Sequence, residues 1–560
     1  MKFKIFSLVL SLLVVINSYA QRSTAECEIA QTSSELNINN VRTTIYSIGD
    51  MWWDIQQGKA KYEVTKGGGV HALFAGSIWI GGKDSYGQVK VATTMFRQRG
   101  VDFAPGPLNQ DGQTSIDVCR EYDKMWSITK EEVKEFRAWW QCYNDPTCND
   151  NEFDSYTIPD IILNWPAHGP EGGYDMYLAP FWDYNEDGYY NPYDGDFPYF
   201  EFPEDSITDD IDCIKSRNKR QSLRGDQAIW FVFNDAGKEH SNSDSEKIGL
   251  EIRAVAYAYS TNTPINDLTF YNYEIINRST ETLYETYVGF WTDADLGYAK
   301  DDYVGCDVGR GLGYIYNGDE NDETAEGISG YGAQPPAAGI DIFEGLFQDN
   351  DGQDNETSYE VINGVRTLNC ELGDIMNVNI NGLNFEDGVI DNERWGATSF
   401  MYFNCGGCGN PSTIGPVSTQ DYYNYLRAYW TDNTHMLYDG TGHSSYVGTS
   451  TVPTNYMFPG NPTSDICGYG QNGIIMSGWS EETASNPAGD RRFVISNGPI
   501  TLAPGAVNNL TMGVVYARAT SGGAYASVEA MKRVDDIAQN LFDNCFRVLD
   551  GPDAPNLTIM

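Results

Sequence analysis

The stretch L-E-I-R-A-V-A-Y-A-Y, Leu250 to Tyr259, decides the fold class of this chain. Its side chains alternate with a period of two, which is the period of a β-strand. The first face carries aliphatic residues and the second is largely aromatic, as in a strand that lies inside a sheet covered on both sides. We therefore predict a strand whose two faces are both buried.

Similar apolar runs, bounded by Gly, Pro, Asn and Asp, occur on both sides of this stretch. Such runs are typical of short strands separated by turns. They span residues 228–233, 268–276, 287–292, 493–496 and 510–517. Short strands with turn signals between them predict β-sandwich units. The expected fold class is mainly β, with sandwich-like units, a few packed α-helices and long Gly- and Asp-rich loops.

Two segments predict packed helices. Thr129 and Glu132 have the spacing of a capping box at the start of a helix near 129–141. Towards the end of the chain, apolar residues recur at helical spacing and predict a second helix near 527–545. The residues of that apolar stripe are Val528, Met531, Val534, Ile537, Leu541 and Cys545.

The first residues predict export from the cytoplasm. Lys2 and Lys4 precede an apolar run from Ile5 to Ile16, and small residues follow up to Ala20, which is the layout of a secretory signal. We expect cleavage after Ala20. The next residue is Gln21 rather than Cys, so this site offers no lipoprotein anchor, and no later run is long enough to span a bilayer.

The length of 560 residues predicts more than one structural unit. We divide the chain into a signal peptide at 1–20, an N-terminal β-rich domain at 21–240, a β-sandwich-like domain at 241–550 and the start of a linker at 551–560. The boundary rests on the polar stretch from Asn234 to Lys247, which could equally be a long hairpin loop.

Composition excludes one class of partner and suggests another. The chain has 36 basic and 79 acidic residues and a net charge of −43, which repels nucleic acid. Such a surface either keeps an exported protein soluble or gathers carboxylates around divalent cations. Eleven cysteines in an exported chain favour disulfides over zinc. Cys142 with Cys148 and Cys405 with Cys408 are candidate local pairs, and the odd count leaves at least one thiol outside such pairs.

The stretch D-Y-N-E-D-G-Y-Y-N-P-Y-D, Asp183 to Asp194, carries the strongest chemical signal. Calcium prefers roughly six to eight oxygen ligands, and a loop with oxygens at alternate positions and a glycine at the sixth can supply them. The alternative is an Asp/Asn/Gly turn that binds no metal. Nearby prolines disfavour the flanking helices of an EF-hand. The predicted ligands are Asp183, Asn185, Asp187, Tyr189 through its carbonyl and Asp194, with Asp196 as a weaker candidate.

A second acidic cluster follows a predicted strand end, where ligand-rich loops are common. Its spacing matches no familiar metal loop, so a solvated acidic turn and a cation site are both open. The candidate ligands are Asp293, Asp295, Asp301 and Asp302.

Signals for catalysis are few. None of the five histidines lies in H-E-x-x-H spacing, and there is no G-x-S-x-G elbow. His168 is expected to be a hydrogen-bonded loop residue. Aromatic residues make up 13% of the chain and are expected mainly to fill the β cores. The adjacent pairs Trp52–Trp53 and Trp139–Trp140 would each expose one ring in a sugar-stacking platform.

Several segments spread over nearly the whole chain carry a resemblance. They are F-A-G-S-I-W-I-G-G at Phe74, F-A-P-G-P-L at Phe103, N-W-P-A-H-G at Asn164, the Asp183 loop, G-D-Q-A-I-W-F-V-F-N-D at Gly225, D-D-Y-V-G-C-D at Asp301, D-R-R-F at Asp490 and D-G-P-D-A-P at Asp550. They resemble a recurring region of large secreted proteins of Bacteroidota that leave the cell by the type IX secretion system. The resemblance implies a cell-surface or released protein with the type IX machinery as a partner, and it implies no established activity. Such proteins continue into adhesion modules and a sorting domain, so we expect a longer parent protein.

These observations favour a secreted or cell-surface adhesion or scaffold protein, stabilised by calcium and without catalytic activity. A surface glycan or another surface protein would be its partner. The first alternative is a carbohydrate-binding module of a polysaccharide-degrading system. The second is an unrecognised glycoside hydrolase, because 79 acidic residues offer many carboxylate pairs.

Overall fold

The computed structural model describes residues 26–148, 153, 155–200, 222–362, 365–371, 380–403 and 411–543. The predicted signal peptide, the Cys405–Cys408 pair and the start of the predicted linker lie outside these residues.

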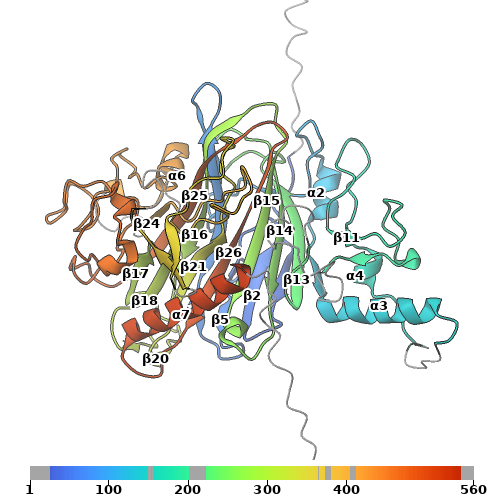
Figure 1. The fold of residues 1–560 in the computed structure, drawn as a ribbon, viewed down its shortest axis with the longest axis horizontal. Coiled ribbons are helices and arrows are strands. Elements are labelled where there is room, and N and C mark those ends of the chain that lie inside the picture. Colours follow the sequence, from blue (N-terminus) through green and yellow to red (C-terminus); the bar gives the residue numbers. More distant parts are fainter. Residues whose placement is uncertain are drawn as a thin grey trace, which may run out of the picture.

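Two antiparallel sheets pack face to face and form the body of the molecule (Figure 1). Within the described residues the larger sheet has nine strands, in the order β10 (Trp126–Thr129), β13 (Gln227–Asn234), β14 (Leu250–Ala258), β15 (Thr269–Asn277), β26 (Val507–Ala517), β21 (Ala337–Glu344), β18 (Leu312–Asn317) and β17 (Asp302–Asp307), with β9 (Ala104–Pro105) paired to β13. The smaller sheet has five strands there, in the order β24 (Ser399–Phe403), β25 (Arg492–Leu502), β16 (Leu283–Asp293), β7 (Ala75–Lys83) and β8 (Val89–Ala92).

The main hydrophobic core lies between the two sheets. Trp79 of β7 and Trp291 of β16 are fully buried and stack with their ring centroids 6.2 Å apart. Phe231 and Ile252 reach the same core from the larger sheet. Burying rings of this size supplies much of the driving force for closing the sandwich. The prediction of a mainly β, sandwich-like fold is therefore confirmed.

Strand β14 is buried on both faces, as its sequence pattern predicts. Ile252 and Ala254 belong to the core between the sheets, whereas Val255 and Tyr257 belong to a second core on the outer face of the larger sheet. The second core exists because helices cover that outer face. A strand in this position needs apolar residues on both sides, since neither side meets water.

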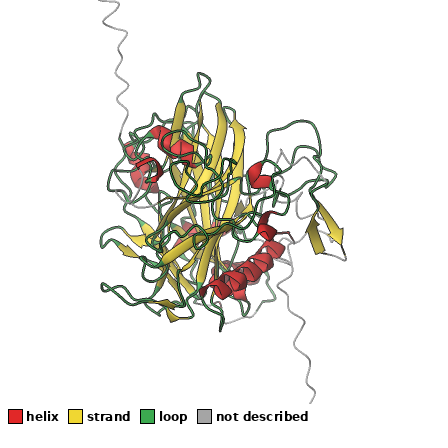
Figure 2. Cartoon of the chain, turned by 90° about the vertical axis from the view of Figure 1, so that its left-hand side faces the viewer, coloured by secondary structure: helices red, strands yellow, loops and turns green. Residues whose placement is uncertain are grey.

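Helix α7 (Ala524–Asp543) lies across the outer face of the larger sheet and is the predicted C-terminal helix (Figures 1 and 2). Val528 and Met531 on its inner side are fully buried. Phe542 stacks on Phe343 of β21 with centroids 4.8 Å apart. The apolar stripe of this helix thus closes one side of the second core.

Helix α3 (Lys130–Asn144) begins where the capping box predicts. The Glu132 N–H donates to Thr129 Oγ1 at 3.2 Å, and the Thr129 N–H donates to Glu132 Oε2 at 2.8 Å. Both bonds satisfy N–H groups that a helix start leaves unpaired. Val133 and Phe136 bury the inner face of the helix in the second core. The disulfide predicted between Cys142 and Cys148 closes the loop that follows.

The remaining elements are short. A sheet of four strands in the described structure contains β1 (Ser33–Leu36), β2 (Val41–Tyr46), β5 (Tyr62–Val64) and β6 (His71–Leu73). Two-stranded ribbons pair β3 (Trp53–Asp54) with β4 (Lys59–Ala60), β11 (Phe181–Trp182) with β12 (Phe197–Pro198), β19 (Asn321–Asp322) with β20 (Gly332–Ala333), and β22 (Tyr359–Ile362) with β23 (Val365–Leu368). The other α-helices in the described residues are α2 (Ile116–Tyr122), α4 (Asp160–Leu163) and α6 (Thr419–Tyr425), and the 3-10 turns there are η2 (Pro192–Asp194), η4 (Pro264–Asp267), η6 (Pro411–Thr413), η7 (Pro462–Asp465) and η8 (Tyr469–Gln471).

Strands from both sides of the predicted boundary at residue 240 share the two sheets. Strands β13 and β14 pair antiparallel along their length, so the stretch from Asn234 to Lys247 is the hairpin loop between them. In the smaller sheet, β7 pairs with β16, which lies about two hundred residues later in the sequence. The sandwich is therefore assembled from both segments of the chain.

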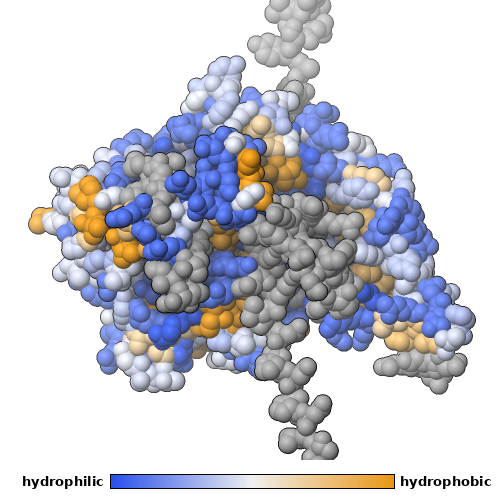
Figure 3. All heavy atoms as spheres, viewed as in Figure 1, coloured by the Kyte–Doolittle hydropathy of each residue, from blue (hydrophilic) through white to orange (hydrophobic). Residues whose placement is uncertain are grey.

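Three disulfides occur among the described cysteines, two of which join distant segments: Cys27 with Cys119 and Cys370 with Cys467. Cys306 is the free thiol in the described part, and it is buried. None of the described helices has both the length and the apolar character that crossing a membrane requires. The face in Figure 3 is largely hydrophilic, with small scattered apolar areas.

Candidate metal centre

The side chains of the acidic loop from Asp183 hold the loop's own backbone. Asp183 Oδ2 accepts from the Gly188 N–H at 2.7 Å, and Asp187 Oδ1 accepts from the Tyr189 N–H at 2.8 Å. Asn185 Oδ1 accepts from the Asp187 N–H at 3.1 Å. Gly188 has φ +83°, a left-handed conformation that glycine adopts without strain. The sharp turn thus lies at the sixth loop position, as the sequence pattern predicts.

Asp196, the weaker candidate ligand, is buried inside this loop. Its Oδ1 accepts from the Tyr184 N–H and its Oδ2 from the Asn191 N–H, both at 2.8 Å. Burial raises the pKa of Asp196 and outweighs these two donors, and the nearby charges of Asp183 and Asp187 raise it further. The charges of Asp183 and Asp187 therefore act on Asp196, although within the described residues these three do not form a group of converging carboxylate oxygens.

On the other side of the loop, Asp194 and His168 form further hydrogen bonds. Asp194, predicted at position twelve, is exposed, and its carboxylate accepts from the Asn191 side-chain amide at 2.6 Å. His168 Nε2 accepts from the Tyr190 N–H at 2.8 Å, and its Nδ1 lies 2.7 Å from the Met176 carbonyl oxygen. His168 is thus a hydrogen-bonded loop residue, as expected from its context.

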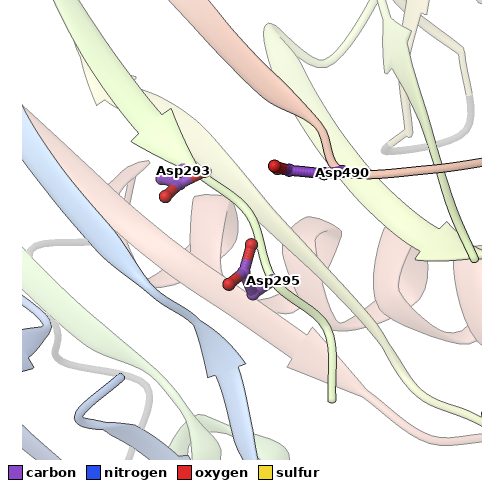
Figure 4. Close-up of side chains that lie close together, drawn as sticks. All are labelled: Asp293, Asp295 and Asp490. Carbon is purple, nitrogen blue, oxygen red and sulfur yellow. The ribbon is translucent and has the colours of Figure 1, made fainter. Parts of the chain in front are cut away.

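A group of three carboxylates lies where strands β16 and β25 meet. Asp293 is the last residue of β16 and pairs with Arg492, the first residue of β25. Asp295 follows β16 and Asp490 precedes β25, so their side chains meet at the same end of the sheet (Figure 4). Asp293, Asp295 and Asp490 each offer one oxygen, and these oxygens all lie within 4.8 Å of one another. We call this group the Asp293 centre.

A single guanidinium neutralises part of the Asp293 centre. Arg492 Nε lies 3.1 Å from Asp293 Oδ1, and Arg492 Nη1 lies 3.1 Å from Asp490 Oδ1. The Arg492 guanidinium also lies over the ring of Phe96, 5.5 Å from its centroid. Three ionised carboxylates and one guanidinium have a net charge of −2. Hard carboxylate oxygens and this charge suit a calcium ion, with backbone or water oxygens completing its ligands.

Burial makes the ionised form of this centre costly when no cation is bound. Burial and then the charge of Asp295 raise the pKa of Asp293 well above its ordinary value, against the opposing effect of Arg492. Burial and then the charge of Asp490 raise the pKa of Asp295 to about 7. Carboxylates in this setting take up either a proton or a cation. Without a bound cation, the Asp293 centre therefore favours protonated carboxyl groups near neutral pH.

Asp301 and Asp302 lie beside the Asp293 centre but outside the group of three. Asp302 is fully buried, and its Oδ2 accepts from the Leu296 N–H at 3.1 Å. Burial raises the pKa of Asp302, with Asp301 and Asp295 adding to the effect. Burial, with Glu323 and Asp322, raises the pKa of Asp301 to about 8. The predicted cluster is thus divided between the Asp293 centre and a neighbouring acidic group.

Sequence reasoning missed Asp490 and Arg492 as members of the centre. Both lie in the segment D-R-R-F at the start of β25, almost two hundred residues after Asp293. The available signal was a pair of charged residues next to a predicted strand. Only the pairing of β25 with β16 brings them to Asp293.

Most tryptophans fill the cores, as expected. Trp52 and Trp53 are both buried, so neither ring of this pair is available for a ligand. Trp139 and Trp140 on α3 are half-buried, and Tyr143 beside them is 72% exposed. Of the two predicted tryptophan pairs, only the pair on α3 is therefore partly exposed.

Comparison with known proteins identifies no relative of this chain. No protein-family model matches this chain, and no curated protein is similar to it.

Proposed function

We propose that this chain is a secreted or cell-surface adhesion or scaffold protein whose sandwich is stabilised by calcium. The observation that carries the proposal is the Asp293 centre, where three carboxylates with a residual charge of −2 converge from two paired strands. A cation bound there links the end of β16 to the start of β25. Because the unfolded chain lacks this arrangement, calcium would stabilise only the folded state.

We propose the Asp183 loop as a second calcium site. The charges of Asp183 and Asp187 act on Asp196 there, and Asp183 Oδ1 is buried without a hydrogen-bond donor. The Asn185 side chain and the Tyr189 carbonyl would complete the ligands, with Asp194 available after a rotation. Calcium would replace hydrogen bonds within the loop and hold it against the second core.

An extracellular location fits the disulfides. Cys27–Cys119 and Cys370–Cys467 join segments 92 and 97 residues apart, and such links persist in an oxidising environment. Export by the leader at 1–20 and passage by the type IX machinery are part of the same proposal. The acidic, hydrophilic surface suits a protein that remains soluble outside the cell.

Calcium is expected to raise the thermal unfolding midpoint of the mature chain. With an extracellular-type affinity of about 10⁻⁴ to 10⁻³ M, about 10 mM calcium should add about 1 to 3 kcal/mol to the free energy of unfolding per site. The measurement is thermal unfolding in calcium, in magnesium and in chelator. Asp490→Asn should remove the contribution of the Asp293 centre, and Asp183→Asn that of the loop. Equal midpoints in calcium and chelator would contradict the proposal.

Carbohydrate binding is the second candidate because of one group of rings. Trp140 lies between Tyr143 and Tyr184, with centroid distances of 6.3 and 6.0 Å, and the two tyrosines are 72% and 60% exposed. Rings of this kind stack on sugars. Trp140 also packs against Gly195, so the Asp183 loop positions it.

A glycan ligand should slow the protein in affinity gels that contain soluble polysaccharides. We expect Trp140→Ala to weaken the affinity for the polysaccharide roughly 5- to 30-fold, because stacking on one ring contributes roughly 1 to 2 kcal/mol. The control is Tyr86→Ala, which removes another ring that is 90% exposed. Equal retardation of both variants would exclude α3 as the binding surface.

A further inference from the structure

A serine, a histidine and an aspartate form a hydrogen-bonded row in the long insertion between β24 and β25. Asp432 Oδ2 lies 2.9 Å from His443 Nε2, and Ser445 Oγ lies 2.6 Å from His443 Nδ1. In Figure 1 this insertion forms the orange loops at the left of the sandwich. Nucleophile, base and orienting carboxylate within hydrogen-bond reach of one another are the geometric signature of an activated serine.

The hydrogen bonds fix the tautomer that such a base needs. The Ser445 N–H donates to His443 Nδ1 at 3.1 Å, so Nδ1 carries the lone pair and Nε2 carries the proton. That proton faces Asp432. Burial opposes ionisation of Asp432, but hydrogen bonds from Thr434 and His443 outweigh it and lower its pKa to about 2. The carboxylate is therefore ionised and holds the imidazole in this orientation.

The histidine is buried and the serine is accessible. The ring of His443 lies edge-on to Trp430 at 6.0 Å and to Tyr446 at 6.4 Å, and the residue is only 5% exposed. The Trp430 Nε1–H donates to the Gly442 carbonyl at 2.8 Å, which secures the indole against the loop. Ser445 itself is exposed to solvent. The base is thus fixed in place, while the nucleophile faces any substrate that arrives from solution.

We propose that Ser445, His443 and Asp432 form a hydrolytic site for small neutral carboxylic esters, an activity beyond the proposed function. Ser445 Oγ would bond to the ester carbonyl carbon while its proton moves to His443 Nδ1. The tetrahedral intermediate would break its bond to the alcohol oxygen, and that oxygen would take the proton. Water would then attack the acyl-serine, give its proton to His443 and release the carboxylic acid, and the proton would return to Ser445.

The hydrogen bonds of His443 favour esters over amides as substrates. His443 Nδ1 shares its lone pair between the hydroxyl and the N–H of Ser445, which weakens it as a base. An alkoxide leaves more readily than an amide nitrogen and needs less help from proton transfer. The net charge of −43 and the adjacent Asp432 carboxylate disfavour anionic substrates. A neutral carboxylic ester meets both conditions.

Labelling with a fluorophosphonate probe tests the nucleophile in the full mature chain. Ser445 Oγ would bond to phosphorus, fluoride would leave, and His443 would take the hydroxyl proton. We expect the probe on Ser445 by peptide mass spectrometry and at least about a tenfold loss of labelling in Ser445→Ala. Ser444→Ala is the matched control, because Ser444 is the neighbouring exposed serine. No labelling, or equal labelling of Ser444, would overturn the proposal.

Hydrolysis of p-nitrophenyl acetate separates catalysis from a structural role of the row. Asp432→Asn should lower kcat more than it changes KM, because it removes the carboxylate that orients the imidazole. Thermal unfolding of each variant reports whether the loop remains folded. If Asp432→Asn unfolds the loop, Ser445→Ala carries the decision, since it leaves the His443–Asp432 contact in place. Hydrolysis that is independent of Ser445 would overturn the proposal.

Discussion

Replacing Asp295 with asparagine is expected to stabilise the calcium-free protein at pH 8 by about 4 kcal/mol. Burial and the charge of Asp490 raise the pKa of Asp295 from its ordinary 3.8 to about 7. One pKa unit corresponds to about 1.4 kcal/mol, so ionising this group in the folded state costs about 4 kcal/mol relative to the unfolded chain. Asparagine keeps the shape of the side chain and removes this cost.

The sign of the pH dependence follows from the raised pKa. Below about pH 4, Asp295 is protonated in both states and costs nothing. As the pH rises from about 4 to 7, the unfolded chain loses the proton first, so the stability of the chelated protein falls. Calcium should reverse this fall, and Asp295→Asn should reduce the fall and remove the contribution of the Asp293 centre to the calcium response.

Urea unfolding at pH 5 and pH 8, in chelator and in calcium, measures these effects. Asp117→Asn is the control, because this carboxylate is 97% exposed and its replacement should change stability by less than about 0.5 kcal/mol. If Asp295→Asn destabilises the chelated protein at pH 8, the ionised Asp295 carboxylate does not cost folding free energy. The calcium proposal would then lose its basis.

Replacing Asp235 with alanine is expected to cost about 4 kcal/mol of folding free energy. Asp235 is fully buried in the hairpin loop between β13 and β14. Its carboxylate accepts from the N–H groups of Ile248, Gly249 and Leu250. Its Oδ2 also lies 3.4 Å from His240 Nε2. Alanine would leave three donors and a buried cation without their partner, and a broken buried ion pair costs roughly 3 to 5 kcal/mol.

The pH dependence of His240 supplies the control for this prediction. Nδ1 and Nε2 of its ring each lie 2.8 Å from a carbonyl oxygen, those of Val91 and Asp235, and only the imidazolium donates from both. Burial lowers the pKa of His240, but the hydrogen bond to Asp235 and the charges of Asp102 and Asp235 outweigh it and raise the value to about 9.

Because the pKa of His240 is raised, its stabilisation is fully present below about pH 6.5 and is lost as the pH rises through about 9. The loss corresponds to about 3 kcal/mol. Asp235→Asn should flatten this dependence while keeping an acceptor for part of the loop. Urea unfolding from pH 6 to 10 measures it. A profile that is identical in parent and Asp235→Asn would show that His240 is neutral in the folded protein.

Local features of the sequence were sufficient for the two long helices and for several strands of the two sheets. The Thr129–Glu132 spacing placed the start of α3, and the alternation from Leu250 placed β14 with both faces buried. Helix α7 followed from a single apolar stripe. These features act between residues a few positions apart, where periodicity and capping chemistry leave few alternatives.

Local chemistry also identified part of the candidate sites. Asp293 and Asp295 were predicted because acidic residues follow a strand end, and Gly188 marked the turn of the Asp183 loop. The adjacent Asp301 and Asp302 fell outside the group of three, because alternating and turning backbone sends neighbouring carboxylates in different directions. Ser445 and His443 carried no recognised motif, and Asp432 meets them only through the folded loop.

The sequence by itself thus determined the class of the two long helices and of several central strands, the burial of β14 and the acidic character of the loops. The tertiary structure decided which strands pair across about two hundred residues, which distant cysteines meet, and that Asp490 and Arg492 complete the Asp293 centre. The physical reason is the separation along the chain over which each effect acts. Alternation and helix caps follow from adjacent backbone geometry, whereas strand register depends on how all the buried faces fit together at once.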